Sequence, residues 1–124
     1  MANKIQLDLR GIEKLLKAEP QKGGRWLTAF AESIVTDIKL SFGTSPSSPG
    51  NPPGVDTGTL RASIRQENTG SFERTVSDGV EYGVYLEDGT ERIKPRPFFK
   101  PAFDRAFRRM EQDAKDNLGL EDGL

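Results

Sequence analysis

The chain has 124 residues, with 18 Lys and Arg against 19 Asp and Glu and a formal net charge of −1. It has no cysteine and no histidine, which excludes disulfides and thiolate chemistry and removes the usual general base and the commonest metal ligand. No apolar run is long enough to cross a membrane or to form a signal peptide, so we expect one cytosolic domain over residues 1–124.

The N-terminal segment predicts an edge strand followed by a short helix. Residues 5–9 alternate between apolar and polar, as a half-buried strand does. Apolar residues then recur at helical spacing over residues 12–16, and Pro20 ends that helix. Gly23 and Gly24 are expected to form a hinge.

A long amphipathic helix is predicted from Arg25 to Phe42, with Gly43 as its C-cap. Its apolar stripe steps by four residues: Trp26, Phe30, Ile34, Ile38 and Phe42. Because Trp26 and Phe30 lie on this stripe, we expect them to pack in the core and not to form a ligand platform.

A mobile Pro-rich loop is predicted over residues 44–55, since proline and glycine disfavour helix and central strand. After it we expect a meander of strands at Leu60–Glu67 and Phe72–Ser77, with Leu60, Ala62 and Ile64 facing the same layer as Phe72 and Val76. Residues 80–87 fit a strand or a short helix, and the sequence leaves both open.

The last predicted element is a helix that starts at Phe98 and ends at Gly119, followed by a frayed tail over residues 119–124. Its apolar seam comprises Phe99, Phe103, Ala106, Phe107, Met110, Ala114 and Leu118. Two long amphipathic helices need a surface to cover, so we expect an α+β fold in which a small antiparallel meander packs against both.

Three stretches, PPGVDTGTLRASI, EYGVYLEDGT and RPFFKPAF, carry a resemblance. In this order and spacing the chain resembles a family of small neck and tail-completion proteins of tailed bacteriophages, over about Ile5 to Leu118. The resemblance implies a structural, non-enzymatic subunit that forms a ring at the head–tail junction or at the upper end of the tail.

Further expectations follow from this resemblance. It implies a homo-oligomeric ring, with a hexamer favoured, other neck or tail proteins as partners, and a place in the virion after assembly in the bacterial cytoplasm. The residues themselves lead us to expect no cofactor and no metal, because no glycine pattern fits a nucleotide and the Asp-x-Asp spacing of a metal loop is absent.

Charge is segregated along the chain, because residues 91–109 are mostly basic, whereas residues 44–90 and the tail are acidic. Opposed patches suit head-to-tail packing of identical copies, and solvated surface is the other explanation. The expected interface residues are Pro49, Pro52, Pro53, Val55, Asp56, Arg61, Glu87, Arg92, Lys94 and Arg96.

Two other functions are weighed against assembly. The basic stretch over residues 92–109 could bind the phosphates of DNA, as in a small dedicated DNA-binding accessory protein. Alternatively, a ring that encircles passing DNA could expose basic residues to its channel: Lys100, Arg105, Arg108 and Arg109. Carboxylates at Asp56, Glu87 and Asp88 could serve a hydrolase. We favour a turn cap for Asp56, and for Glu87 an ion pair with Arg61 or Arg96.

Overall fold

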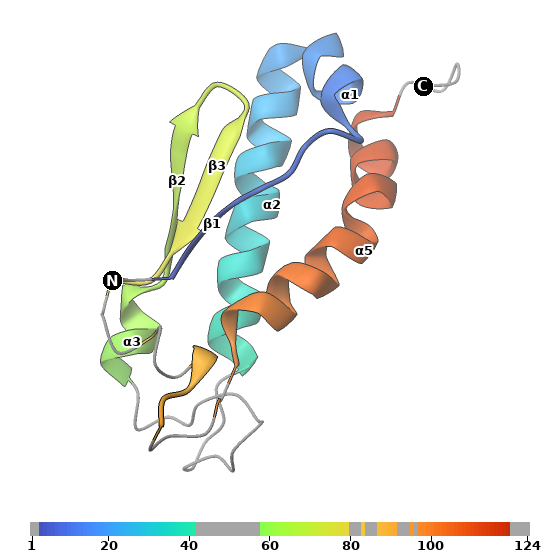
Figure 1. Cartoon of the computed structure of the whole chain (residues 1–124). Coiled ribbons are helices and arrows are strands. Elements are labelled where there is room, and N and C mark those ends of the chain that lie inside the picture. Colours follow the sequence, from blue (N-terminus) through green and yellow to red (C-terminus); the bar gives the residue numbers. More distant parts are fainter. Residues whose placement is uncertain are drawn as a thin grey trace.

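The computed structural model describes residues 3–41, 58–79, 83, 87–91, 95 and 97–119. The long helices α2 and α5 lie side by side, and the small sheet packs on α2, which confirms the predicted α+β fold (Figure 1). In chain order the elements are β1 (Lys4–Gln6), α1 (Glu13–Ala18), α2 (Pro20–Ser41), α3 (Gly58–Ser63), β2 (Arg65–Gly70), β3 (Glu73–Ser77) and α5 (Phe99–Leu118).

The sheet has the order β1-β3-β2, and both outer strands run antiparallel to β3. Val76 at its centre pairs with Ile5 on one side and Gln66 on the other. Val76 is fully buried, because this face of the sheet covers α2. The predicted edge strand at the N-terminus is confirmed, although it is only three residues long.

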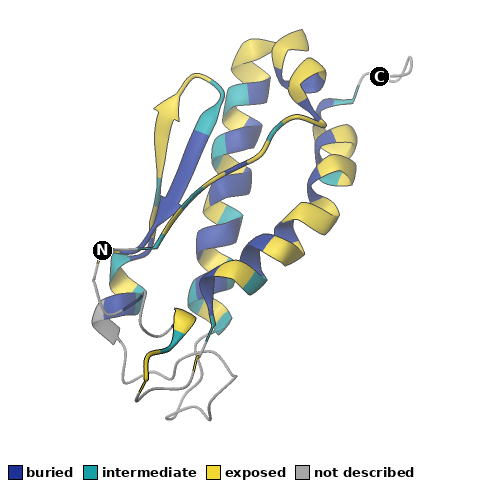
Figure 2. Ribbon diagram, in the orientation of Figure 1, coloured by how far each residue is buried: buried dark blue, intermediate teal, exposed yellow. Residues whose placement is uncertain are grey.

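The core lies between the sheet and the facing sides of α2 and α5 (Figure 2). The apolar stripe of α2 is buried from Trp26 to Ile38, and the rings of Trp26 and Phe30 stack at 5.0 Å between centroids. This confirms the prediction that both aromatic residues belong to the core.

The predicted strand at Leu60–Glu67 is partly wrong. Residues up to Ser63 form α3, and the strand starts only at Arg65. Leu60 and Ile64 are buried while Ala62 is exposed, so the apolar residues follow a spacing of four, which a helix also satisfies. An alternation over so few residues does not distinguish the two structures.

The predicted hinge at Gly23 and Gly24 is also wrong, because α2 begins at Pro20 and passes through both glycines. Proline suits the first turn of a helix, where its missing N–H has no partner to lose. Gly23 lies against the backbone of Leu16 at the end of α1, and a Cβ atom there would stand 2.2 Å from the Leu16 carbonyl oxygen.

Phe107 departs from the predicted seam of α5, since it is 40% exposed. Ala106 and Met110 occupy the buried face, and Phe107 is turned about 100° from Ala106 around the helix. The other seam residues are buried, and Gly119 caps the C-terminal end as expected.

The predicted Pro-rich loop 44–55 and the C-cap Gly43 lie outside the described residues. Most of residues 80–87 also lie outside them, but Gly83, Glu87 and Asp88 are helical.

Candidate functional site

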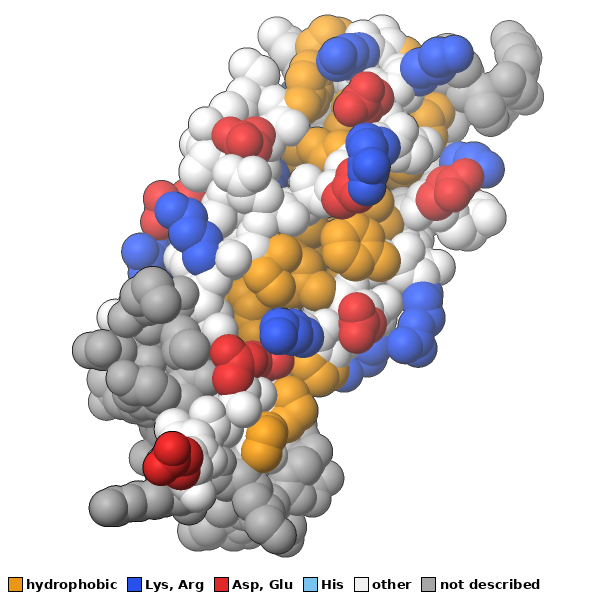
Figure 3. All heavy atoms as spheres, in the orientation of Figure 1, with side chains coloured by type: hydrophobic (Ala, Val, Ile, Leu, Met, Phe, Trp, Pro, Cys, Tyr) orange, Lys and Arg blue, Asp and Glu red, His pale blue; other side chains and the backbone are white. Residues whose placement is uncertain are grey.

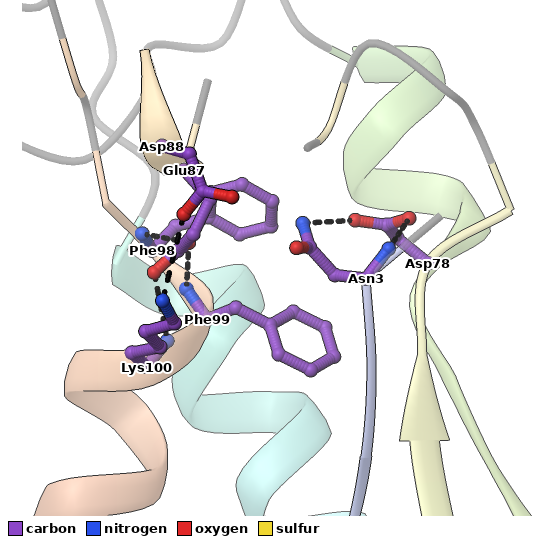
Figure 4. Close-up of polar contacts among 7 residues, drawn as sticks. All are labelled: Asn3, Asp78, Glu87, Asp88, Phe98, Phe99 and Lys100. Carbon is purple, nitrogen blue, oxygen red and sulfur yellow. Dashed lines mark hydrogen bonds and ion pairs between the residues drawn. The ribbon is translucent and has the colours of Figure 1, made fainter. Parts of the chain in front are cut away.

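The N-terminus of α5 is held by one buried carboxylate, that of Glu87 (Figure 4). Its Oε1 accepts hydrogen bonds from the backbone N–H groups of Phe98 at 2.9 Å and Phe99 at 2.8 Å, and its Oε2 accepts one from Lys100 at 3.0 Å. A helix leaves its first N–H groups without partners and carries a partial positive charge at that end. The Glu87 carboxylate accepts hydrogen bonds from these N–H groups and places a negative charge at the positive end of α5.

The predicted ion pair between Glu87 and Arg61 is therefore wrong, because Glu87 instead caps a helix through backbone groups. Arg96, the other predicted partner, lies outside the described residues. The neighbouring Asp88 lies at the surface, 3.5 Å from the Lys100 ammonium.

A second buried carboxylate, Asp78, lies at the end of β3 and binds the N-terminal strand (Figure 4). It accepts hydrogen bonds from the backbone N–H of Asn3 at 3.0 Å and from the Asn3 side-chain amide at 2.9 Å. Gly83 packs so closely that a Cβ there would stand 2.4 Å from Asp78 Oδ2. Asp78 thus joins β1 and β3 and lies against Gly83.

Burial raises the pKa of Asp78 above its ordinary value of 3.8, and the nearby Glu87 carboxylate adds to the rise, whereas the hydrogen bonds from Asn3 lower it. The folded state then binds this proton more tightly than the unfolded state. Stability contributed by this group is therefore lost as pH rises from 3.8 through the folded pKa. We expect an NMR titration to place the pKa of Asp78 above 3.8, and higher still in Asn3→Ala. A value at or below 3.8 would contradict the assignment.

Arg74 lies on the buried face of β3, and its hydrogen bonds link the β2–β3 hairpin to α2. Its guanidinium donates to the carbonyls of Gly70 and Glu73 at 2.8 Å, to Gly24 at 3.2 Å and to Thr28 Oγ1 at 3.0 Å. All of these acceptors are neutral. Burial lowers the pKa of Arg74, yet a guanidinium remains charged in proteins.

Two of the four predicted DNA-facing residues, Arg105 and Arg109, contact side chains of α2. Arg105 forms a two-point ion pair with Asp37 at 3.0 and 3.1 Å. Arg109 lies over the ring of Phe30, 5.1 Å from its centroid, and donates to Ser33. These contacts join the outer faces of α2 and α5.

Lys100 and Arg108 complete that set. The Lys100 ammonium faces Asp88, and Arg108 is exposed without a salt bridge to any described carboxylate. Of the predicted interface residues, the structure describes only Arg61, which is half-buried on α3, and Glu87. The others lie outside the described residues: Pro49, Pro52, Pro53, Val55, Asp56, Arg92, Lys94 and Arg96.

Asp78 and Arg74 are not among the residues predicted from the sequence. Arg74 occupies the same side of β3 as Val76, so a charged residue at an inward position of a strand was the available signal. Asp78 gave no such signal, because its partner Asn3 lies 75 residues away in the chain.

One comparison with known proteins identifies the chain. A family model described as "Bacteriophage HK97-gp10, putative tail-component" matches residues 9–89, which is more than half of the sequence. The chain belongs to this HK97-gp10-like family. No curated protein matches, and no solved structure matches.

Membership in the HK97-gp10-like family makes the chain a structural tail component of a bacteriophage and places it in the virion. The matched segment contains α2, the strands β2 and β3, and Glu87, whereas β1 lies before it and α5 lies beyond it. The cap formed by Glu87 therefore ties the last helix to the end of the family segment.

The described part of this HK97-gp10-like protein bears on metal binding, on Glu87 as a hydrolase candidate and on membrane crossing. There, no group of three Asp or Glu side chains could hold a metal ion. Glu87, a candidate in the hydrolase hypothesis, directs both oxygens to backbone N–H groups. In the same part, no helix combines the length and apolarity that crossing a membrane requires.

Proposed function

We propose that this HK97-gp10-like protein is a ring-forming, non-enzymatic subunit at the head–tail junction or the upper end of the tail of a tailed phage or prophage. The observation that carries the proposal is the family match over residues 9–89 to a phage tail component. In a heterologous interface, one surface of each copy meets a different surface of the next, and a ring forms where the rotation between successive copies closes.

The expected contacts of the ring come from the segregated charge. One copy presents the acidic segment before residue 90, and the next presents the basic stretch around Arg92, Lys94 and Arg96. The Pro-rich loop, including Pro49, Pro52 and Pro53, docks on a neighbour as extended chain, because proline limits the entropy lost on ordering.

A dedicated DNA-binding role is less well supported. Arg105 and Lys100 face carboxylates within the chain, and Arg109 covers the Phe30 ring, so much of the basic patch is already engaged. Phosphate binding requires cationic side chains that are free to replace the counterions of DNA. In α5, the other predicted DNA-facing residues already have partners, so Arg108 is the main candidate.

The proposed function is tested by native mass from light scattering behind a sizing column, across protein concentration and at low and moderate salt. We expect a closed multiple of the 13.7 kDa chain whose population falls as salt screens the charged contacts. A chain that stays monomeric throughout but binds duplex DNA with a steep salt dependence would favour the DNA-binding alternative.

A further inference from the structure

Among the residues that the structure describes, the three-stranded sheet has two open edges. Within the described residues, β3 is the only strand that pairs with β1 or with β2. An open edge presents unpaired N–H and C=O groups and is a ready template for another strand. In a ring of identical copies, the β2 edge of one subunit and the β1 edge of the next are available to each other.

The hydrogen bonds to β3 determine which backbone groups point outward. On β1, Asn3 and Leu7 bond to β3, through Asp78 N–H to the Asn3 carbonyl and Leu7 N–H to the Arg74 carbonyl. Since direction alternates along a strand, Lys4 and Gln6 direct their N–H and C=O groups to the open edge.

The backbone groups of β2 alternate in direction in the same way. Arg74, Val76 and Asp78 bond towards β1, so Thr75 and Ser77 bond towards β2. Their partners are Glu67 and Arg65. The intervening residues of β2, Gln66 and Asn68, therefore direct their backbone groups to its open edge.

We propose that β2 of one copy adds in parallel to the open edge of β1 in the next copy, with Lys4 opposite Glu67. In a parallel pair, a residue bonds to the two residues that flank its neighbour. In this register Lys4 N–H meets the Gln66 carbonyl, and Asn68 N–H meets the Lys4 carbonyl. The contact rests on the ring proposed above.

Charge selects this register. Lys4 and Glu67 lie on the same outer face of the sheet, because Lys4 pairs with Ser77 and Glu67 pairs with Thr75 on β3. Glu67 is 54% exposed, and its bond to Arg65 at 2.9 Å leaves room for a second cation. A shift of two residues would instead place Lys4 opposite Arg65, a like-charge pair that is unfavourable.

The direction of pairing agrees with a ring. Since β1 and β2 both run antiparallel to β3, they are parallel to each other, and copies related by rotation about an axis along the strands meet in parallel. Three strands span about 14 Å, whereas two helices side by side need about 16–20 Å. In each copy, the layer of strands is therefore narrower than the layer of helices. Joining the sheets of successive copies then curves the assembly, with the sheets facing the ring axis.

The open side of β1 also carries apolar surface. Hydrophobic side chains reach the surface between β1 and α5, where a further strand would lie (Figure 3). Ile5 in β1 and Leu9 shortly after it are only partly buried. An incoming β2 would remove part of this surface from water, which adds to the backbone hydrogen bonds.

The absence of native cysteine permits a direct test of the register. We expect the variant Lys4→Cys with Glu67→Cys to form a ladder of disulfide-linked multimers on mild oxidation. Within one chain these positions lie two strand spacings apart, about 10 Å, beyond the roughly 7 Å limit for a disulfide, so only contacts between copies can link them. Lys4→Cys with Arg65→Cys is the matched control, about 8 Å apart in the proposed register, and should give little ladder.

A second variant tests the backbone contact while the side-chain charges stay native. Gln6→Pro removes only an outward N–H, so the monomer should fold while association weakens about tenfold or more. Gln6→Ala keeps that N–H and should associate like wild type.

Wild-type rings that persist in Gln6→Pro, or equal ladders in both cysteine pairs, would overturn the strand pairing and leave the proposed ring intact. A wild-type chain that stays monomeric at its highest soluble concentration, with no ladder from either pair, would overturn both.

Discussion

Replacing Glu87 with alanine is expected to lower the free energy of unfolding by about 3 kcal/mol, because it removes the carboxylate that accepts from the buried N–H groups of Phe98 and Phe99. Water cannot readily replace the carboxylate, since Glu87, Phe98 and Phe99 are each less than 5% exposed. The loss also removes a negative charge from the positive end of α5.

Urea unfolding followed by circular dichroism measures this effect, and two neighbouring variants control it. Glu87→Gln keeps one acceptor oxygen but places an NH₂ group where the second oxygen accepted, so about half of the loss is expected. Asp88→Ala removes an exposed carboxylate with a long ion pair and should cost less than about 1 kcal/mol. Equal losses in Glu87→Ala and Asp88→Ala would show that Glu87 is not the cap.

Periodicity over many residues allowed the long helices to be predicted. Trp26, Phe30, Ile34 and Ile38 are buried, and so are their neighbours Leu27, Ala31 and Val35. Adjacent buried residues that recur every four positions fit one face of a helix, whereas a strand would place them on opposite faces. Over shorter stretches, periodicity does not distinguish a helix from a strand. The segment from Leu60 to Ile64 fits either a strand or the observed α3. Phe107 adjoins the apolar seam of α5 in the sequence but is exposed, so the sequence does not define where the buried face of that helix ends.

The contacts that fix the site join residues far apart in the chain. Glu87 was singled out because it stands beside a Gly-Thr turn, but its partners are backbone groups 11 to 13 residues later, which carry no side-chain signal. The bond between Asp78 and Asn3 depends on the order of strands in the sheet, which residue patterns alone do not determine. An ion pair was the natural expectation for Glu87, because only side chains are visible in a sequence.

Gly23→Ala is expected to destabilise the protein by about 2 to 3 kcal/mol, although alanine is the better helix former. A Cβ atom at residue 23 would stand 2.2 Å from the carbonyl oxygen of Leu16 and 2.9 Å from its Cα. Backbone cannot move aside as the end of a flexible side chain can, so α1 must shift away from α2. That shift would disturb Leu15 and Leu16, which α1 contributes to the core.

Gly24→Ala provides the matched control, because it makes the same chemical change one residue later in the same helix. Its Cβ would meet only the Arg74 side chain, at an ordinary 3.8 Å, and the Gly24 carbonyl that accepts from Arg74 is retained. The gain in helix propensity should then appear alone, raising stability by up to about 1 kcal/mol. Opposite signs for the two variants in thermal unfolding would establish that α1 and α2 meet at Gly23 in direct backbone contact, whereas gains in both would show that the helices are not in close contact there.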